Sequence, residues 1–246
     1  MGIKKKVFGL IIKKFPFLLP FITLLLSIYF RVLLLPAKEG YIIQTRQFKF
    51  KCPLEAGFNS VYVFKEVFSG IYERFTNKAD LIVDCGAHIG FFTIKMTKMR
   101  RKVIAIEPHP TNLLFLKENI RKNEVKNVTV VEKAVGDKKG KAEFFFGNSF
   151  DTGSLRFPSK SSIEVEVDTL DSICKELNVS GIDLLKIDVE GAELDVLKGA
   201  EESLKFTKNI AMELHYEGED EEIRRFLEER GFTVKIVGNM LYASKQ

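Results

Sequence analysis

Residues 81–90, LIVDCGAHIG, join an apolar run to an acid and two glycines. The run has the composition of a buried strand, which ends near Asp84 and is followed by Gly86 and Gly90. Glycine allows tight turns and lets a ligand or a second backbone come close. In an open parallel sheet, ligands bind beyond the carboxyl ends of the strands. The spacing predicts a ligand-binding loop here, with Ala87 as a further small residue in it.

A second acid, Glu107, ends the next apolar run, 102–108, and Pro108 follows it. A doubly wound fold places an acid at this point to hold ribose hydroxyls. A dinucleotide site usually carries G-x-G-x-x-G, and the third glycine is missing here. A carboxylate at Asp84 would repel a phosphate but suits a cofactor with a cationic amino-acid end. We therefore favour S-adenosylmethionine over a nicotinamide or flavin dinucleotide. In the alternative without a ligand, Gly86 and Gly90 only end the strand and Glu107 is a solvated charge at a strand end.

The third apolar run, 127–135, should border the adenine of such a cofactor where it ends. Val135 is its last residue, and Asp137 follows in a turn. We expect Asp137 to accept a hydrogen bond from the adenine amino group. The alternative is that Asp137 only forms the turn.

A second polar group lies at the end of the apolar run 182–191. Alternation along a strand places Lys186 and Asp188 on the same face. Asp188 lies nearer the carboxyl end and is the candidate for general base or metal ligand; alternatively it holds loop amides. Glu193 is expected to stabilise the start of the next helix, where acids interact well with the helix dipole.

A histidine ends the strand pattern 209–216, whose sequence is NIAMELHY. The unperturbed pKa of His215, about 6.5, suits a general base, although a lone histidine is more often structural. Its neighbour Glu213 shares the same strand face. Asp188, His215 and Lys186 are thus the candidate catalytic residues, and no ligand spacing in the chain calls for a metal site.

The elements that carry these residues alternate regularly from residue 79 onward. Apolar strand patterns at 79–86, 102–108, 127–135, 182–191 and 209–216 are separated by helical patterns, including 91–100 and 111–123 with Thr111 as N-cap. Such alternation predicts a Rossmann-like, doubly wound, mostly parallel α/β sheet with right-handed crossovers. An antiparallel C-terminal hairpin around Gly238 closes it.

Three further segments complete the expected organisation. Residues 1–35 form an apolar, basic-flanked helix that associates with a membrane, and residues 36–78 form an extension that packs on the core. Within the main domain, 79–246, the alternating and turn-rich stretch 139–167 is expected to form an antiparallel insertion that acts as a lid over the acceptor.

Charge distribution separates the leading segment from the body of the chain. Residues 1–35 contain no acid, whereas the rest of the chain carries 32 basic and 33 acidic residues. The near-neutral body gives no argument for nucleic-acid binding. The leading segment fits an interfacial membrane anchor; a secretory signal and a helix docked on the body are the alternatives. Three widely spaced cysteines indicate neither a disulfide framework nor a zinc site.

The motifs together resemble the FkbM family of S-adenosylmethionine-dependent methyltransferases. The matching stretches are VDCGAHIGFFTIKM, AIEPHPTNLLFLKENI, VVEKAVGD, VDTLDSI, LLKIDVEGAELDVLKGA and MELH. The resemblance implies methyl transfer to an oxygen and cofactor contacts at Asp84, Gly86 and Glu107. Two departures are His88, where an asparagine is expected, and His109 after Pro108.

We therefore expect an O-methyltransferase that acts on a sugar, glycolipid or secondary metabolite at the cytoplasmic face of a membrane. A nucleotide-dependent oxidoreductase on the same sheet and a non-catalytic membrane-attached binding module are the alternatives. The sequence names neither the acceptor nor the oligomeric state.

Overall fold

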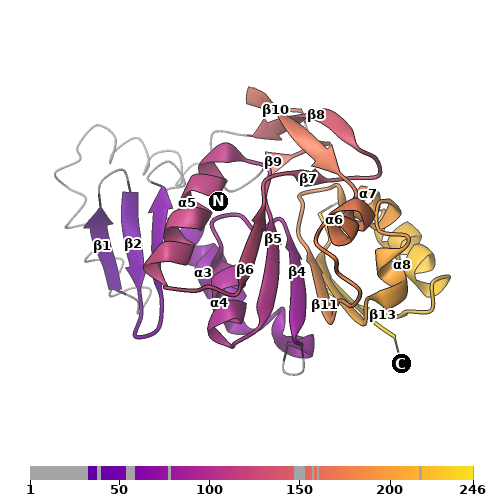
Figure 1. Ribbon diagram of the computed structural model, residues 1–246, viewed down its shortest axis with the longest axis horizontal. Coiled ribbons are helices and arrows are strands. Elements are labelled where there is room, and N and C mark those ends of the chain that lie inside the picture. The colour runs from indigo at the N-terminus through magenta and orange to yellow at the C-terminus, as the bar shows by residue number, and fades with distance from the viewer. Residues whose placement is uncertain are drawn as a thin grey trace.

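The computed structural model describes residues 33–37, 40–53, 59–76, 79–146, 153–156, 158–159, 161–215 and 218–245. A seven-stranded sheet forms its centre (Figure 1), in the order β13 (Thr233–Val237), β14 (Met240–Ser244), β12 (Asn209–Glu213), β11 (Leu184–Ile187), β4 (Leu81–Cys85), β5 (Lys102–Ile106) and β6 (Val128–Val131). From β12 to β6 all neighbours are parallel, and β14 is antiparallel to β12 and β13. The predicted doubly wound α/β fold is confirmed, with its switch point between β4 and β11.

Helices cover both faces of this sheet (Figure 1). Helices α4 (Phe91–Lys98) and α5 (Pro110–Lys122) lie on one face, and α6 (Leu170–Glu176), α7 (Glu193–Lys198) and α8 (Asp220–Glu228) lie on the other. Successive strand residues point to opposite faces of the sheet. Ile82 packs in the core beneath α4, and Val83 packs in the core beneath α6 and α7. This double burial explains the unbroken apolar runs of the sequence.

Helix α5 begins one residue earlier than predicted. Its N-cap is His109 and not Thr111, and Pro110 occupies the first turn. Proline suits this position because its φ is already helical and its missing N–H needs no partner.

The insertion forms a sheet of its own next to the carboxyl ends of the central strands (Figure 1). Its strands are β7 (Ala134–Val135), β10 (Ser161–Asp168), β8 (Gly140–Phe146) and β9 (Gly153–Ser154), in that spatial order. Strands β8 and β10 are antiparallel, as the alternation predicts. The single strand expected at 127–135 is wrong, because the chain leaves the central sheet after Val131 and β7 pairs with β10.

The described N-terminal part forms a second small sheet beside α5. Its strands β1 (Leu33–Ala37), β2 (Gly40–Gln44) and β3 (Lys49–Pro53) are antiparallel, and α3 (Asn59–Ser69) and the short helix η2 (Glu73–Phe75) follow. Residues 33–35 of the expected leading helix thus lie in a strand, and the rest of that helix lies outside the described residues. Among the described helices, none has the length and apolarity that a membrane span requires.

Two buried amides, Asn119 and Asn123, join the small sheet to the main domain. The side chain of Asn119 accepts a hydrogen bond from Lys51 N at 2.7 Å and donates to Lys51 O and Ile89 O at 3.0 and 2.9 Å. Asn119 is fully buried, so its loss would leave several backbone groups without a partner.

We predict that Asn119→Ala lowers the free energy of unfolding by about 2–4 kcal/mol, since each unsatisfied buried group costs about 1–3 kcal/mol. Urea denaturation followed by circular dichroism measures this change. The exposed amide Gln47 provides the control, and Gln47→Ala should change stability by less than about 0.5 kcal/mol. Equal effects of the two substitutions would contradict the assignment.

Candidate active site

The two glycines after β4 serve different purposes. Gly86 has φ +80°, and a Cβ there would lie 1.8 Å from the carbonyl oxygen of Asp188. Gly90 has φ +92°, and its Cβ would lie 2.6 Å from Leu116 on α5. Gly86 therefore lets the loop after β4 pass directly against the end of β11. Gly90 allows the first turn of α4 to pack on α5, and neither it nor Ala87 lines the cavity described below.

A buried lysine joins the ends of β4 and β11. The Nζ atom of Lys186 lies 3.0 Å from Asp84 Oδ1 and 3.3 Å from Asp188 Oδ2, and it donates to Gly86 O at 2.9 Å. Burial alone would lower the pKa of Lys186, but the carboxylates of Asp84 and Asp188 raise it above its usual value. Thr93 donates to the other oxygen of Asp84 at 2.5 Å.

This arrangement corrects two expectations. Asp84 is 0% exposed and faces Lys186 and Thr93, so its carboxylate does not reach the cavity where we expected it to hold the amino-acid end of a cofactor. Lys186 is 3% exposed and does not line the cavity either. Lys186 contacts the Gly86 backbone and the Asp188 side chain, and Asp84 contacts Lys186.

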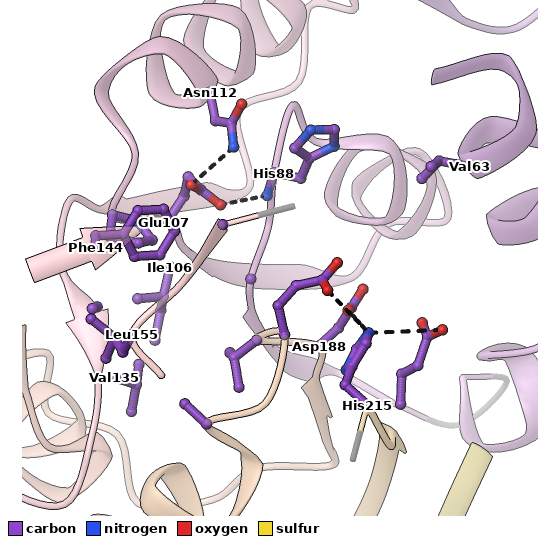
Figure 2. Close-up of a pocket in the computed structure, with 18 of the residues that line it drawn as sticks. Val63, His88, Ile106, Glu107, Asn112, Val135, Phe144, Leu155, Asp188 and His215 are labelled. Atoms are coloured by element: carbon purple, nitrogen blue, oxygen red, sulfur yellow. Dashed lines mark hydrogen bonds and ion pairs between the residues drawn. The ribbon is translucent and has the colours of Figure 1, made fainter. Parts of the chain in front are cut away.

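A cavity opens beyond the carboxyl ends of β4, β5, β11 and β12, with an empty volume of about 1040 Å³ that includes its open side. Glu107 lies at one end (Figure 2). Its carboxylate accepts hydrogen bonds from His88 N at 2.8 Å, His109 N at 2.9 Å and Asn112 Nδ2 at 3.2 Å. Burial raises the pKa of Glu107, whereas these three donors lower it.

The end of the cavity around Glu107 fits a nucleoside. Asn112 Oδ1 is buried and accepts no hydrogen bond from the described residues. A ribose hydroxyl next to Glu107 would supply the missing donor. Apolar side chains of Ile106, Val135 and Phe144 line the neighbouring wall, together with Leu155 and Pro108, where a flat base would find apolar contact. The carboxylates around this cavity suit an uncharged or cationic ligand better than a phosphate.

Asp137 does not take part in this wall. It is exposed and does not line the cavity, so the expected hydrogen bond to an adenine amino group is not supported. The chain turns away after Gly136, whose amide donates to Asp168 O at 3.0 Å.

The other end of the cavity holds His215 among several carboxylates (Figure 2). Its Nε2 atom lies 3.8 Å from Asp188 Oδ1, 3.7 Å from Glu190 Oε2 and 4.0 Å from Glu213 Oε1. Its Nδ1 atom lies 2.8 Å from Glu193 Oε1, which also accepts from Gly191 N at 2.9 Å. Because a carboxylate only accepts, Nδ1 carries the proton in this arrangement.

Glu193 thus does more than stabilise the start of α7. It is 1% exposed and fixes the ring of His215, so that Nε2 faces the cavity. Burial would lower the pKa of His215, but the hydrogen bond with Glu193 and the charges of Glu190 and Asp188 raise it to about 9. Burial also raises the pKa of Glu190 to about 7.

The N-terminal part completes this end of the cavity in a way that the sequence did not show. The hydroxyl of Tyr72 lies within hydrogen-bond distance of Glu213 Oε2 (3.2 Å) and of Asp188 Oδ2 (3.5 Å). Val63 and Glu66 of α3 also line the cavity. The only sequence signal was a strand or helix pattern before residue 76, which says nothing about contacts more than 100 residues away.

Several known proteins with similar sequences are named as methyltransferases. Residues 84–234 match the model of the methyltransferase FkbM domain. The chain is similar to methyltransferase sdnD of Sordaria araneosa, at 28% identity over 70% of this chain and 82% of the relative. It is also similar to 2-O-methyltransferase NoeI of Sinorhizobium fredii (29%; 74% and 83%) and to hexuronic acid methyltransferase AglP of Haloferax volcanii (24%; 64% and 65%). The matched domain covers more than half of the chain, which therefore belongs to the FkbM methyltransferase family.

Proposed function

We propose that this chain transfers a methyl group from S-adenosylmethionine, the cofactor expected of its family, to a hydroxyl group of a sugar, glycolipid or secondary metabolite. One observation carries the proposal. The polar pair Glu107 and Asn112 and the acid–base group around His215 line a single cavity. A nucleoside held at the first end would place its reactive part toward the second.

The residues have separate tasks in this reaction. Bound S-adenosylmethionine supplies a methyl group on a sulfonium, and its in-line transfer requires that acceptor and cofactor be aligned. Glu107 and Asn112 would hold the ribose, while the apolar wall encloses the base. The acceptor hydroxyl would lie against the carboxylates around His215, one of which takes its proton. Lys186 and Asp84 touch neither partner and keep Asp188 in place.

The acceptor class is supported by the relatives and by the cavity. The names of NoeI and AglP refer to 2-O-methylation and to a hexuronic acid. The wall around His215 is rich in carboxylates, with the hydroxyl of Tyr72 among them, and these acceptors suit the many hydroxyl donors of a sugar. We extend the sugar-like acceptor to this chain on these two grounds.

The leading segment supports a location at a membrane surface. Residues 15–30, FPFLLPFITLLLSIYF, carry no charge, and Lys13 and Lys14 precede them. A helix of sixteen residues would span about 24 Å, which is short of the roughly 30 Å hydrocarbon core. We propose that this segment lies in the cytoplasmic interface, where the cofactor is available.

The first prediction concerns the cofactor. Glu107→Gln should weaken binding of S-adenosylmethionine by roughly 10–100-fold, since hydrogen bonds to a charged group contribute about 1.5–3 kcal/mol. Isothermal titration calorimetry measures the affinity. Asp137→Asn is the matched control, because Asp137 lies outside the cavity, and it should bind like the wild type. An unchanged affinity for Glu107→Gln would show that the ribose lies elsewhere.

The second prediction concerns transfer. Asp188→Asn should slow methyl transfer by about 100-fold or more, with a smaller effect on cofactor affinity. It disrupts the carboxylate group that holds the acceptor hydroxyl and removes its proton, and such a group usually contributes this much. The assay follows label from S-adenosylmethionine into a glycan and lipid extract. Asp80→Asn, at an exposed position, should keep full activity.

The stability of the labelled product distinguishes ether from ester. An O-methyl ether on a hydroxyl retains its label in mild alkali, whereas a methyl ester on a carboxyl group releases it as methanol. Complete loss of label in alkali would contradict transfer to a hydroxyl.

The third prediction concerns the anchor. Deletion of residues 1–32, which leaves β1 intact, should move the protein from the membrane fraction to the soluble fraction. Sedimentation followed by immunoblotting measures the distribution. The same distribution before and after deletion would contradict a membrane role for this segment.

A further inference from the structure

The carboxylates that face His215 Nε2 lie too far from it for hydrogen bonds. The separations from His215 Nε2 to Asp188 Oδ1 and Glu213 Oε1, 3.8 and 4.0 Å, exceed the usual range of up to about 3.2 Å. The ligand atoms of Asp188, Glu213 and His215 all lie within 4.8 Å of one another. Two ligands at about 2.1 Å from a shared ion lie at most about 4.2 Å apart, so small side-chain shifts would bring all three to one cation.

A second feature of the group is the support behind each ligand. The Nδ1–H of His215 donates to Glu193, which is almost completely buried and lines no part of the cavity. Histidines that bind metals usually donate their other N–H to such a carboxylate, which fixes the ring and its tautomer. His215 Nε2 is thereby the nitrogen that faces the carboxylates.

The two carboxylates are supported in the same way. Tyr72 reaches the second oxygen of both Asp188 and Glu213, and Asn239 donates to Glu213 at 2.8 Å. The three supporting side chains are Tyr72, Asn239 and Glu193. They lie before η2, in the C-terminal hairpin and in α7, which are separate parts of the chain. Together they hold one imidazole and two carboxylates at the edge of an open cavity.

We propose that Asp188, Glu213 and His215 bind one divalent cation, which would hold the acceptor hydroxyl. The inference rests on the proposed function for its role in catalysis but not for the binding itself. One nitrogen and two oxygen donors suit a first-row ion such as Mn²⁺ or Zn²⁺. Three protein ligands leave positions open on the cavity side for an oxygen of the acceptor.

The cation would act on the acceptor oxygen. Coordination lowers the pKa of a bound hydroxyl, and the proton passes to Glu190, the carboxylate of this group that lines the cavity outside the ligand set. The oxygen then forms a bond to the methyl carbon. The carbon–sulfur bond breaks and its electron pair stays on sulfur, which becomes a thioether.

Titration of the full-length protein with Mn²⁺ alone tests the inference. After treatment with a chelator and dialysis, electron paramagnetic resonance measures free Mn²⁺, and calorimetry repeats the titration with Zn²⁺. We expect one ion per chain, and affinity at least about tenfold lower in Glu213→Gln and in His215→Gln. Glu164→Gln, on the exposed side of β10, should bind the ion like the wild type.

Two measurements on the same samples keep the result interpretable. Thermal unfolding without metal shows that each variant is folded, and S-adenosylmethionine titration tests the other end of the cavity. Failure of the wild type to bind either metal, or equal binding by wild type and both folded variants, would overturn the inference. Metal binding without cofactor binding would support the site and contradict the proposed function instead.

Discussion

The site depends on one buried ion group between the ends of β4 and β11. Lys186 and Asp84 are direct register partners on these strands, and the lysine also reaches Asp188 and the carbonyl oxygen of Gly86. An unpaired ammonium at this depth would cost several kcal/mol, so the acids on both strands are required. At these strand ends the backbone of residue 86 lies against the carbonyl oxygen of Asp188, so position 86 has no room for a Cβ.

Next to this ion group, four neighbouring strands each end in one group of the candidate site, all at the same edge of the sheet. Glu107 follows β5, the Gly86 loop follows β4, Asp188 follows β11 and His215 follows β12. Because the strands are parallel, their carboxyl ends all open on one cavity. The order of the strands thus becomes the order of the groups, from the ribose-binding end to the acid–base end.

The sequence predicted the parts of this site that depend on strand ends. Apolar runs located β4, β5, β11 and β12, and Glu107, Asp188 and His215, which follow three of these strands, line the cavity. The alternation pattern predicts on which face of the sheet a side chain lies but not how deeply it is buried. It therefore could not show that Asp84 and Lys186 are buried. The sequence also could not predict contacts between distant segments. Tyr72 and Asp188 are 116 residues apart in the chain, and Asn112 and Glu193 contact Glu107 and His215 on other elements.

A crystal structure with bound S-adenosylhomocysteine tests the central claim most directly. Our account predicts that both ribose hydroxyls contact Glu107 and Asn112, with the sulfur directed toward Asp188 and His215. The base should lie against Val135 and Phe144. A nucleoside bound outside this cavity, or one whose sulfur points away from His215, would contradict the account.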